Sequence, residues 1–248
     1  MYKKNKNASL LASKGAEVIY IDYNDKNDLV KALKGTDVIV SAIGDTDQLA
    51  TQCALLNAAK EVGVKRFIPS EFGCDIKEIT GELHPFHKPK VEFFQELEKS
   101  GMEYTIIVNG LFYEYLSSLG FDHKNKKATF YADGNTKVVC TSYPDIGKYT
   151  VESLELTEAR NGTIRVAGSV LTLNELLKKH EEVTGTKWEV SSDLTVRQRH
   201  KNNTAPVPTL VDDFRAYLTV NIDIKNLHND KFSFTPRPIT EGISLLVK

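Results

Sequence analysis

The chain has 248 residues, 41% of them hydrophobic and 26% charged, so it can bury the core of one large or two small domains. A formal net charge of -1 gives it no field that would recruit nucleic acid or a membrane surface, and no apolar run reaches the ~20 residues that span a bilayer. Three cysteines and six histidines follow no disulfide or metal-ligand spacing, and no signal-peptide pattern opens the chain, so we expect a cytoplasmic protein without a metal site.

The first half of the chain alternates strand-like and helix-like segments. Residues 16–21 are rich in β-formers and predict a strand, whereas residues 27–34 carry the apolar stripe of a helix. The nearly continuous apolar run at residues 37–43 is typical of a strand that is buried on both faces. Residues 47–62 again have the spacing of an amphipathic helix, for which Gly63 is the expected C-cap.

The same alternation continues to the middle of the chain. Residues 67–68 predict a short buried strand, residues 89–99 a helix and residues 104–108 a further strand. This repeated β-α order argues for an α/β fold with a doubly wound, Rossmann-like parallel sheet.

The pattern changes after residue 112. Residues 128–131 and 136–141 predict a hairpin across an Asp-Gly-Asn turn. Helical patterns follow at residues 145–156 and 172–184.

We therefore expect two parts. Residues 1–112 would form the Rossmann-like, NAD(P)-binding part, and residues 113–248 a smaller α+β lobe that faces the substrate. A late strand near residues 163–167 could join the main sheet.

Small and polar residues follow three of the predicted strands. In open α/β sheets, ligands bind at the carboxyl ends of the strands. Ordinary loops need the same residue types, so the repetition at three strand ends is what favours a cofactor site. The candidate cofactor-binding residues are Ala42, Ile43, Gly44, Pro69, Ser70, Phe72, Asn109 and Gly110.

Lys90 lies on the apolar side of a predicted helix. At about 100° per residue it shares an azimuth with Phe93, Phe94 and Leu97, whereas Lys88 points the opposite way. Most helical lysines are solvated, but partial burial and the positive end of the helix macrodipole both disfavour a charged ammonium in the first turn. A lysine in such a position can act as a general acid or base.

The run Val-Lys-Arg-Phe-Ile-Pro-Ser-Glu-Phe-Gly at residues 64–73 resembles a signature of the isoflavone-reductase-like and NmrA-like family, a branch of the atypical short-chain dehydrogenases/reductases. The resemblance is strongest over residues 16–115. It implies a Rossmann-like fold and an NADPH-dependent reductase that acts on a small aromatic substrate, with NADP(H) as the cofactor. It also implies that Lys90, eight residues before Glu98, is the catalytic residue and that Phe112 faces the substrate.

The glycine-rich turn of that family does not occur in this sequence. Neither Gly-x-Gly-x-x-Gly nor Gly-x-x-Gly-x-x-Gly is found, although the N–H groups of such a turn bind the pyrophosphate of the cofactor. The resemblance implies that residues 10–21 correspond to a helix end and the third strand of the family, so the sheet would be N-terminally incomplete. A strand at residues 17–21 would then lack a neighbour, and the edge of residues 37–43 would be unpaired.

Three functions remain as alternatives. The first is the reductase, in which hydride passes from the nicotinamide to a small-molecule substrate and Lys90 handles a proton or stabilises developing charge. The second is a non-catalytic, NmrA-like regulator that senses a dinucleotide and docks a protein partner. The third is a truncated, inactive family member. The retained Lys90 favours the first and the absent glycine turn favours the other two, while a homodimer is compatible with all three.

Overall fold

The computed structural model describes residues 6–44, 48–79 and 82–247. The chain divides into two compact units, which are unit 1 (Met1–Ser70 and Glu92–Glu103) and unit 2 (Glu71–Val91 and Tyr104–Lys248). The division runs through helix α4 (Lys88–Ser100), so the first turn of α4 belongs to unit 2 and the rest to unit 1. A functional boundary between residues 112 and 113 stays a prediction.

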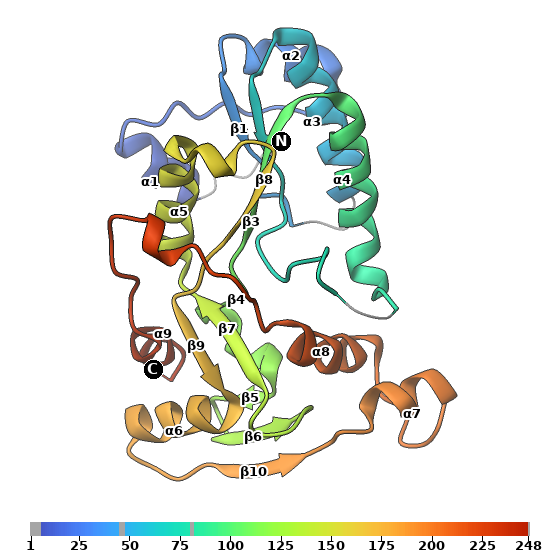
Figure 1. The fold of residues 1–248 in the computed structure, drawn as a ribbon, viewed down its shortest axis with the longest axis vertical. Helices are drawn as coiled ribbons and strands as arrows, with labels where there is room; N and C mark the ends of the chain where they lie inside the picture. Colours follow the sequence, from blue (N-terminus) through green and yellow to red (C-terminus); the bar gives the residue numbers. More distant parts are fainter. Residues whose placement is uncertain (1–5, 45–47, 80–81, 248) are drawn as a thin grey trace. The chain divides into compact units, whose positions relative to one another are not determined.

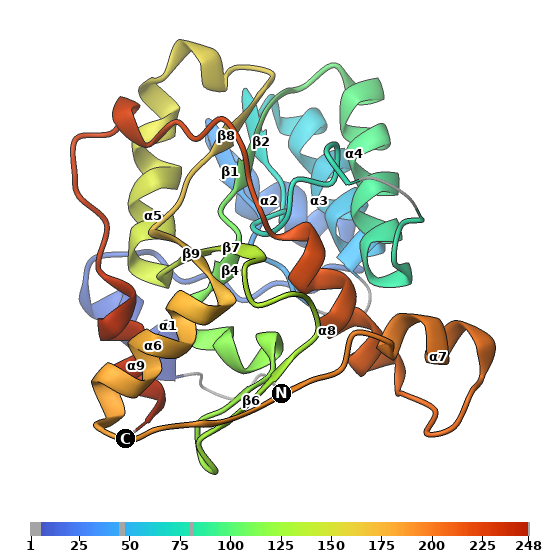
Figure 2. The ribbon, with the colours of Figure 1, turned by 60° about the horizontal axis from the view of Figure 1, so that its bottom comes forward.

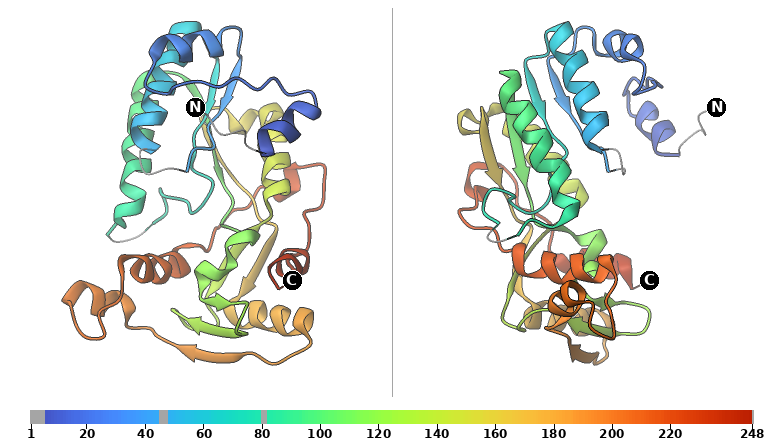
Figure 3. Two further views of the ribbon diagram at one scale, coloured as in Figure 1. Left: turned by 180° about the vertical axis from the view of Figure 1, so that it is seen from behind. Right: turned by 90° about the vertical axis from the view of Figure 1, so that its right-hand side faces the viewer.

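Unit 1 contains one parallel strand pair and the helices around it. Its elements are α1 (Lys6–Ser13), α2 (Lys26–Leu33), β1 (Val38–Val40), α3 (Gln48–Val62), β2 (Arg66–Ile68) and α4 from Glu92 onward. In the pair β1–β2, Ile39 lies opposite Phe67. Figures 1 and 3 show α2 and α3 side by side next to this pair.

Phe67 lies at the centre of the packing of unit 1. Its side chain is fully buried, and its ring centroid lies 5.6 Å from that of Phe93 on α4. The chain reaches β2 through Gly63, whose φ of +81° ends α3 in the left-handed region that favours glycine.

The predicted helices at residues 27–34 and 47–62 are confirmed as α2 and α3, although Asp47 lies outside the described residues.

No strand forms at residues 16–21, where the sequence predicted one. Within the described ranges these residues join no β-ladder, and Ile19 and Tyr20 are 50% and 53% exposed. The prediction is wrong because β-propensity alone does not make a strand, which has to join a β-ladder. The predicted strand at residues 37–43 is also shortened, to β1.

Unit 2 carries three sets of paired strands. The parallel pair is β3 (Glu103–Val108) with β8 (Gly162–Arg165), the second set is β4 (Leu111–Phe112), β7 (Lys137–Thr141) and β9 (Ser169–Thr172), and the third is β5 (Phe121–Asp122), β6 (Lys127–Phe130) and β10 (Glu189–Ser192). The α/β class with parallel strands is confirmed, and β8 is the late strand expected near residues 163–167.

The helices of unit 2 surround these strands. They are α5 (Tyr143–Glu152), α6 (Leu173–Thr184), α7 (Val196–Asn202), α8 (Leu210–Asn221) and α9 (Ile239–Leu246), with short 3-10 turns at Pro85–His87, Tyr113–Leu119, Ser153–Glu155, Thr157–Ala159 and Asn229–Lys231. Figure 2 shows α6 and α9 next to each other. The predicted helix at residues 172–184 is confirmed as α6, which Thr172 begins with a capping box.

The predicted hairpin across residues 133–135 is wrong. Both of its strands exist, but β6 pairs with β5 and β10 whereas β7 pairs with β4 and β9. A turn does form, because Thr136 N donates to Asp133 O at 2.8 Å. The chain turns there without joining the two strands, since each finds its partners elsewhere in the sequence.

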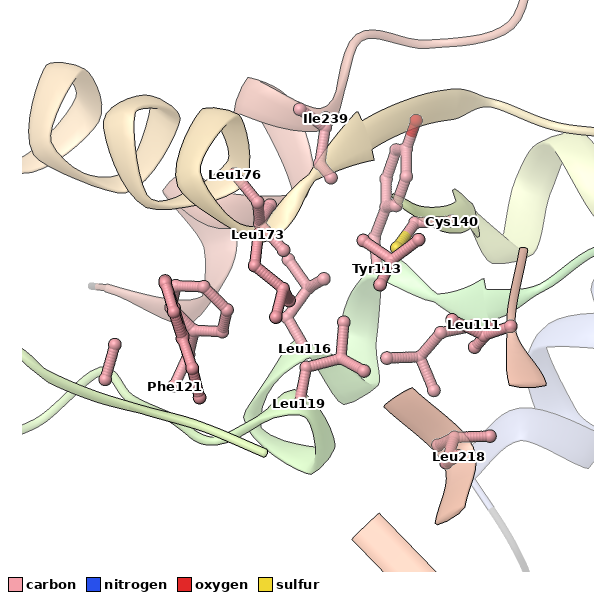
Figure 4. Close-up of a cluster of buried hydrophobic side chains, with 14 of the residues drawn as sticks. Leu111, Tyr113, Leu116, Leu119, Phe121, Cys140, Leu173, Leu176, Leu218 and Ile239 are labelled. Carbon is pink, nitrogen blue, oxygen red and sulfur yellow. The ribbon is translucent and has the colours of Figure 1, made fainter. Parts of the chain in front are cut away.

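The core of unit 2 lies between β7, the 3-10 turn at residues 113–119 and the helices α6 and α9 (Figure 4). Tyr113 is its largest polar member, and its hydroxyl lies 2.9 Å from Ser169 Oγ and donates to Arg237 O. Gly242 of α9 packs on the Tyr113 ring so closely that a Cβ there would lie 2.6 Å from Tyr113 Cβ. A Cβ placed on Gly147 of α5 would instead have no neighbouring atom within 4 Å.

These two helical glycines should respond oppositely to a methyl group. Gly242→Ala overpacks Tyr113 and should lower the free energy of unfolding by about 1–3 kcal/mol. Gly147→Ala removes only the flexibility of glycine and should raise it by about 0.5–1 kcal/mol. Urea denaturation of both variants checks this, and shifts of the same sign would contradict the packing around Tyr113.

The buried His180 forms a pair with the half-buried His123. His180 is fully buried, stacks on Phe121 at 4.3 Å and lies with Nε2 3.2 Å from His123 Nε2. Its Nδ1 lies 2.9 Å from Leu176 O, a contact that requires the N–H on Nδ1. Burial lowers the pKa of His180 to about 4.

The fold should therefore lose stability on acidification. Between the ordinary pKa of histidine, about 6.5, and about 4, the unfolded chain binds a proton that folded His180 does not, so stability falls as the pH falls. The loss amounts to about 3 kcal/mol for this group. Urea titrations at several pH values should give a flatter pH dependence for His180→Gln than for the wild type, and identical slopes would rule the histidine out as the source.

Candidate active site

Lys90 is the third residue of α4. The helix begins at Lys88, directly after the 3-10 turn Pro85–His87, so Pro89 is its second residue and not its first. The turn is capped by His84, whose Nδ1 accepts from Phe86 N at 3.2 Å. The side chain of Lys90 is 19% exposed, which confirms the partial burial that the helical spacing predicted.

Glu71 is the partner of Lys90. The Lys90 ammonium donates to the backbone carbonyl of Glu71, and Nζ lies 3.8 Å from Oε2 of the same residue. The Glu71 side chain is 2% exposed, and its Oε1 has no hydrogen-bond partner in the described part of the chain. Burial raises the pKa of Glu71 against the opposing charge of Lys90. A buried carboxyl and an ammonium thus form a close pair.

The segment that carries Glu71 is fixed by two backbone hydrogen bonds. Asn109 N and Gly110 N donate to Gly73 O at 3.2 and 3.1 Å. Between Glu71 and Gly73, Phe72 has a φ of +26°, which is strained for a residue with a side chain. The predicted site residues Phe72, Asn109 and Gly110 are therefore brought close to Glu71.

Gly110 is needed where it stands. Its φ is +69°, and a Cβ would lie 2.1 Å from Val139 O. Beside it, Thr141 Oγ1 donates to Asn109 O at 2.7 Å, while Asn109 Oδ1 is buried with no hydrogen-bond partner in the described ranges. A buried acceptor left in this state fits a ligand that brings a donor.

His87, in the 3-10 turn before α4, and Tyr217, on α8, form a second polar pair. His87 Nδ1 lies 3.4 Å from Tyr217 Oη. Burial, followed by the Lys90 charge, lowers the pKa of His87 to about 4, so the imidazole is neutral near pH 7. Burial likewise raises the pKa of the neighbouring Cys74 thiol to about 12, which makes it unreactive as a nucleophile.

In unit 1 the structure joins two of the predicted segments. Ser70 Oγ donates to Ile43 O at 2.6 Å, and Ser70 N donates to Gln52 Oε1 at 2.8 Å. Ser41 Oγ and Gln52 Nε2 are buried without a hydrogen-bond partner among the described residues. Of the other candidates in unit 1, Pro69 is buried, whereas Ala42 and Gly44 are exposed.

Phe112, the predicted substrate-facing residue, belongs to a group of three aromatic rings. Its centroid lies 4.6 Å from that of Tyr143 and 5.8 Å from that of Tyr115. Tyr115 and Tyr143 are exposed, whereas Phe112 is half-buried. Aromatic surface of this kind can stack on another ring.

A cavity of about 440 Å³ opens in unit 2 between the segment before α4 and the helices α7 and α8, which Figure 3 shows side by side. His84 Nε2 lies 3.2 Å from Asp213 Oδ2, and Arg197 Nε donates to Asp213 Oδ1 at 3.3 Å. The His84 ring also packs on Tyr217, with centroids 5.3 Å apart. The lining residues are Glu82, Leu83, His84, Pro85, Arg197, Gln198, His200, Lys201, Leu210 and Asp213.

Sequence reasoning found Lys90 but missed the residues around it. Glu71 lies inside the motif at residues 69–73, between two residues that were chosen, and its burial was the missing information. His87 precedes Lys90 by one helical turn, a spacing that could have indicated it. Tyr217 is 130 residues away from His87, and no local pattern connects them.

Two further features are absent from the described ranges. No group of three or more histidine, cysteine, aspartate or glutamate side chains there could hold a metal ion. Nor is any helix in those ranges long and apolar enough to cross a membrane.

The sequence is similar to several plant enzymes. It is 35% identical over 190 residues to pinoresinol reductase 1 of Arabidopsis thaliana, covering 71% of this chain and 60% of that protein. It is 33% identical over 197 residues to eugenol synthase 1 of Petunia hybrida, covering 75% and 63%. The chain therefore spans somewhat less than two thirds of the length of these relatives.

The fold is similar to solved reductase structures. A complex titled AtPrR2 with NADP+ and (+)pinoresinol superposes with a TM-score of 0.78 at 25% identity, covering 96% of this chain and 85% of that one. The binary complex of leucoanthocyanidin reductase and NADPH from Vitis vinifera gives a TM-score of 0.76 at 25% identity, covering 96% and 85%. An isoflavone reductase structure gives 0.81 at 22% identity, covering 100% and 88%, and is similar in fold.

The sequence pattern of the NmrA-like family matches residues 2–201, which is most of the chain. The resemblance first noticed at residues 64–73 is thereby confirmed, together with the Rossmann-like α/β fold that it implied. This chain belongs to the NmrA-like family.

Proposed function

We propose that this chain is an NADPH-dependent reductase for a small aromatic substrate and that Lys90 handles the proton of the reaction. The observation that carries this proposal is the half-buried Lys90 ammonium, held against Glu71 at the start of α4. Pinoresinol reductase 1 and eugenol synthase 1, both relatives at 33–35% identity, support an aromatic substrate. The related structures with NADP+ or NADPH support the cofactor.

The buried polar atoms that lack partners fit a polar ligand. Among the described residues of unit 2, one such atom is Asn109 Oδ1, which follows β3. In unit 1 they are Ser41 Oγ, which follows β1, and Gln52 Nε2. Buried polar groups are normally hydrogen-bonded, so each unit taken by itself supports a polar ligand, and the Asn109 oxygen of unit 2 suits the donor groups of NADP(H). Direct cofactor contacts by Ala42, Ile43, Gly44, Pro69, Ser70, Phe72 and Gly110 stay predictions.

The residues near Lys90 have separate tasks in this proposal. NADPH supplies the hydride when it is bound. Lys90, as an ammonium, donates a proton to the substrate oxygen at which negative charge develops, or stabilises that charge through a hydrogen bond. His87 stays neutral near pH 7 and so places no second positive charge beside Lys90, because burial lowers its pKa to about 4.

The aromatic group Phe112, Tyr115 and Tyr143 gives the substrate a surface to stack on. Its rings are separated by 4.6–6.1 Å, and both tyrosines are exposed. Stacking adds to the burial of an aromatic ligand without fixing its identity. The proposal therefore commits to an aromatic substrate and leaves its substituents open, while a cytoplasmic location and a homodimer stay predictions.

Replacing Lys90 tests the proposal directly. Lys90→Ala should lower kcat by about 10²–10⁴-fold, because general acid–base catalysis contributes that much, and should leave NADPH affinity nearly unchanged. The measurement is NADPH oxidation with (+)-pinoresinol, an isoflavone and a phenylcoumaran benzylic ether as substrates. Lys88→Ala is the matched control, since Lys88 is exposed on the same turn and should change little. Equal losses in both variants would make Lys90 a structural residue.

Cofactor binding by the 248-residue chain should be weak. Each charge-assisted hydrogen bond to the pyrophosphate is worth roughly 1.5–3 kcal/mol, so lacking two of them weakens binding by roughly two to four powers of ten. Isothermal calorimetry with NADPH, alongside a family member whose sequence contains the glycine-rich turn, measures this difference. Equal affinities would mean that other groups of this chain bind the pyrophosphate.

A regulator is the second candidate, and the absence of the glycine-rich turn is what favours it. An NmrA-like regulator would sense a dinucleotide and dock a protein without turnover. It would show NADPH-dependent thermal stabilisation with no oxidation of NADPH by any aromatic substrate. Turnover that depends on Lys90 would exclude it.

A further inference from the structure

We propose that Glu71 is the positioning residue for Lys90: its backbone carbonyl and its carboxylate together hold one ammonium in a single orientation. The inference rests on the proposed function only in that Lys90 handles the proton. Both oxygens come from the same residue, with the carbonyl accepting a hydrogen bond from Lys90 Nζ and Oε2 lying 3.8 Å from it. A long, flexible lysine side chain is thereby fixed at two points.

The carboxylate is placed where its charge acts strongly on Lys90. The Glu71 side chain is 2% exposed, and its Oε1 has no hydrogen-bond partner in the described part of the chain. Water therefore screens this group poorly, and a charge interaction between Oε2 and Nζ is stronger here than it would be at an exposed site. Asp75, Lys77, Cys74 and His87 are titratable groups that interact with this pair, and Asp75 is itself bound by Arg165 through a 2.6 Å hydrogen bond.

The loop geometry holds Glu71 against the helix. The strained φ of Phe72 and the two N–H donors on Gly73 O fix the chain on the C-terminal side of Glu71. Backbone strain is retained where surrounding contacts over-determine a conformation, and such places are concentrated at active sites. A carboxylate needed only for solubility would not require burial on a loop fixed in this way.

Competitive labelling of lysine amines tests the inference without substrate or cofactor. Acetic anhydride at a trace concentration reacts with the neutral amine, and peptide mass spectrometry gives the rate for each lysine. Glu71→Gln should label Lys90 several-fold faster than the wild type does, because the flexible side chain loses the carboxylate that holds its amine in place and becomes more accessible to the reagent. The rate at Lys88 should not change.

Two variants control the labelling. Glu92→Gln removes the same charge from an exposed position on α4 and should leave the Lys90 rate unchanged. Glu71→Asp keeps the charge but withdraws it by one methylene, so it should give a smaller acceleration. If Glu71→Gln does not fold, the Glu71→Asp variant is used in its place. Equal Lys90 rates in the wild type and the Glu71 variant would overturn the inference.

Kinetics separates this inference from the proposed function. If the wild type reduces a substrate, Glu71→Gln should lower kcat by about 10–100-fold with KM for NADPH within twofold, and Glu71→Asp should restore part of the loss. An unchanged kcat in Glu71→Gln, where Lys90→Ala abolishes turnover, would overturn the positioning role. If the wild type reduces no substrate, the reductase proposal fails, and the labelling rates alone decide on Glu71.

Discussion

The close pair of Glu71 and Lys90 is the constraint around which the candidate site is built. A carboxylate that is 2% exposed is costly unless a cation lies close to it, and removing one partner of a buried pair leaves the other uncompensated. Lys90 can be that cation only because α4 begins at Lys88 and turns the third residue toward its apolar side. The position of the helix start, the burial of Glu71 and the chemistry of Lys90 therefore depend on one another.

The loop that presents Glu71 shows the same dependence at the level of the backbone. Phe72 holds a positive φ, and Gly110 lies so close to Val139 that no side chain fits between them. Each feature costs free energy in the folded state, and the hydrogen bonds from Asn109 and Gly110 to Gly73 O offset part of that cost. These features lie at the carboxyl end of β3, where an open α/β sheet binds its ligands.

The sequence analysis predicted correctly those features that depend on local patterns. Apolar spacing located α2, α3 and α6 and placed Lys90 on a partly buried face, because helix packing repeats at a fixed interval. It failed where contacts between residues that are distant in the sequence determine the structure. Residues 16–21 have strand propensity but join no β-ladder within the described ranges, and β6 and β7 pair with distant strands in place of each other. Glu71 and Tyr217 were missed for the same reason, since burial and a contact across 130 residues are tertiary facts.

A dinucleotide reductase has to handle a proton and to bind a pyrophosphate, and these two tasks depend on different segments of the chain. Handling a proton needs a lysine of controlled orientation, and this chain supplies it from α4 and the loop after residue 70. Binding a pyrophosphate needs clustered backbone N–H groups at a helix N-terminus, and no glycine-rich turn in these 248 residues provides them. The two requirements draw on different segments, so one can persist without the other. A solvated surface lysine would not need to be held by a buried carboxylate. The Glu71–Lys90 pair therefore favours the proposed reductase over a regulator.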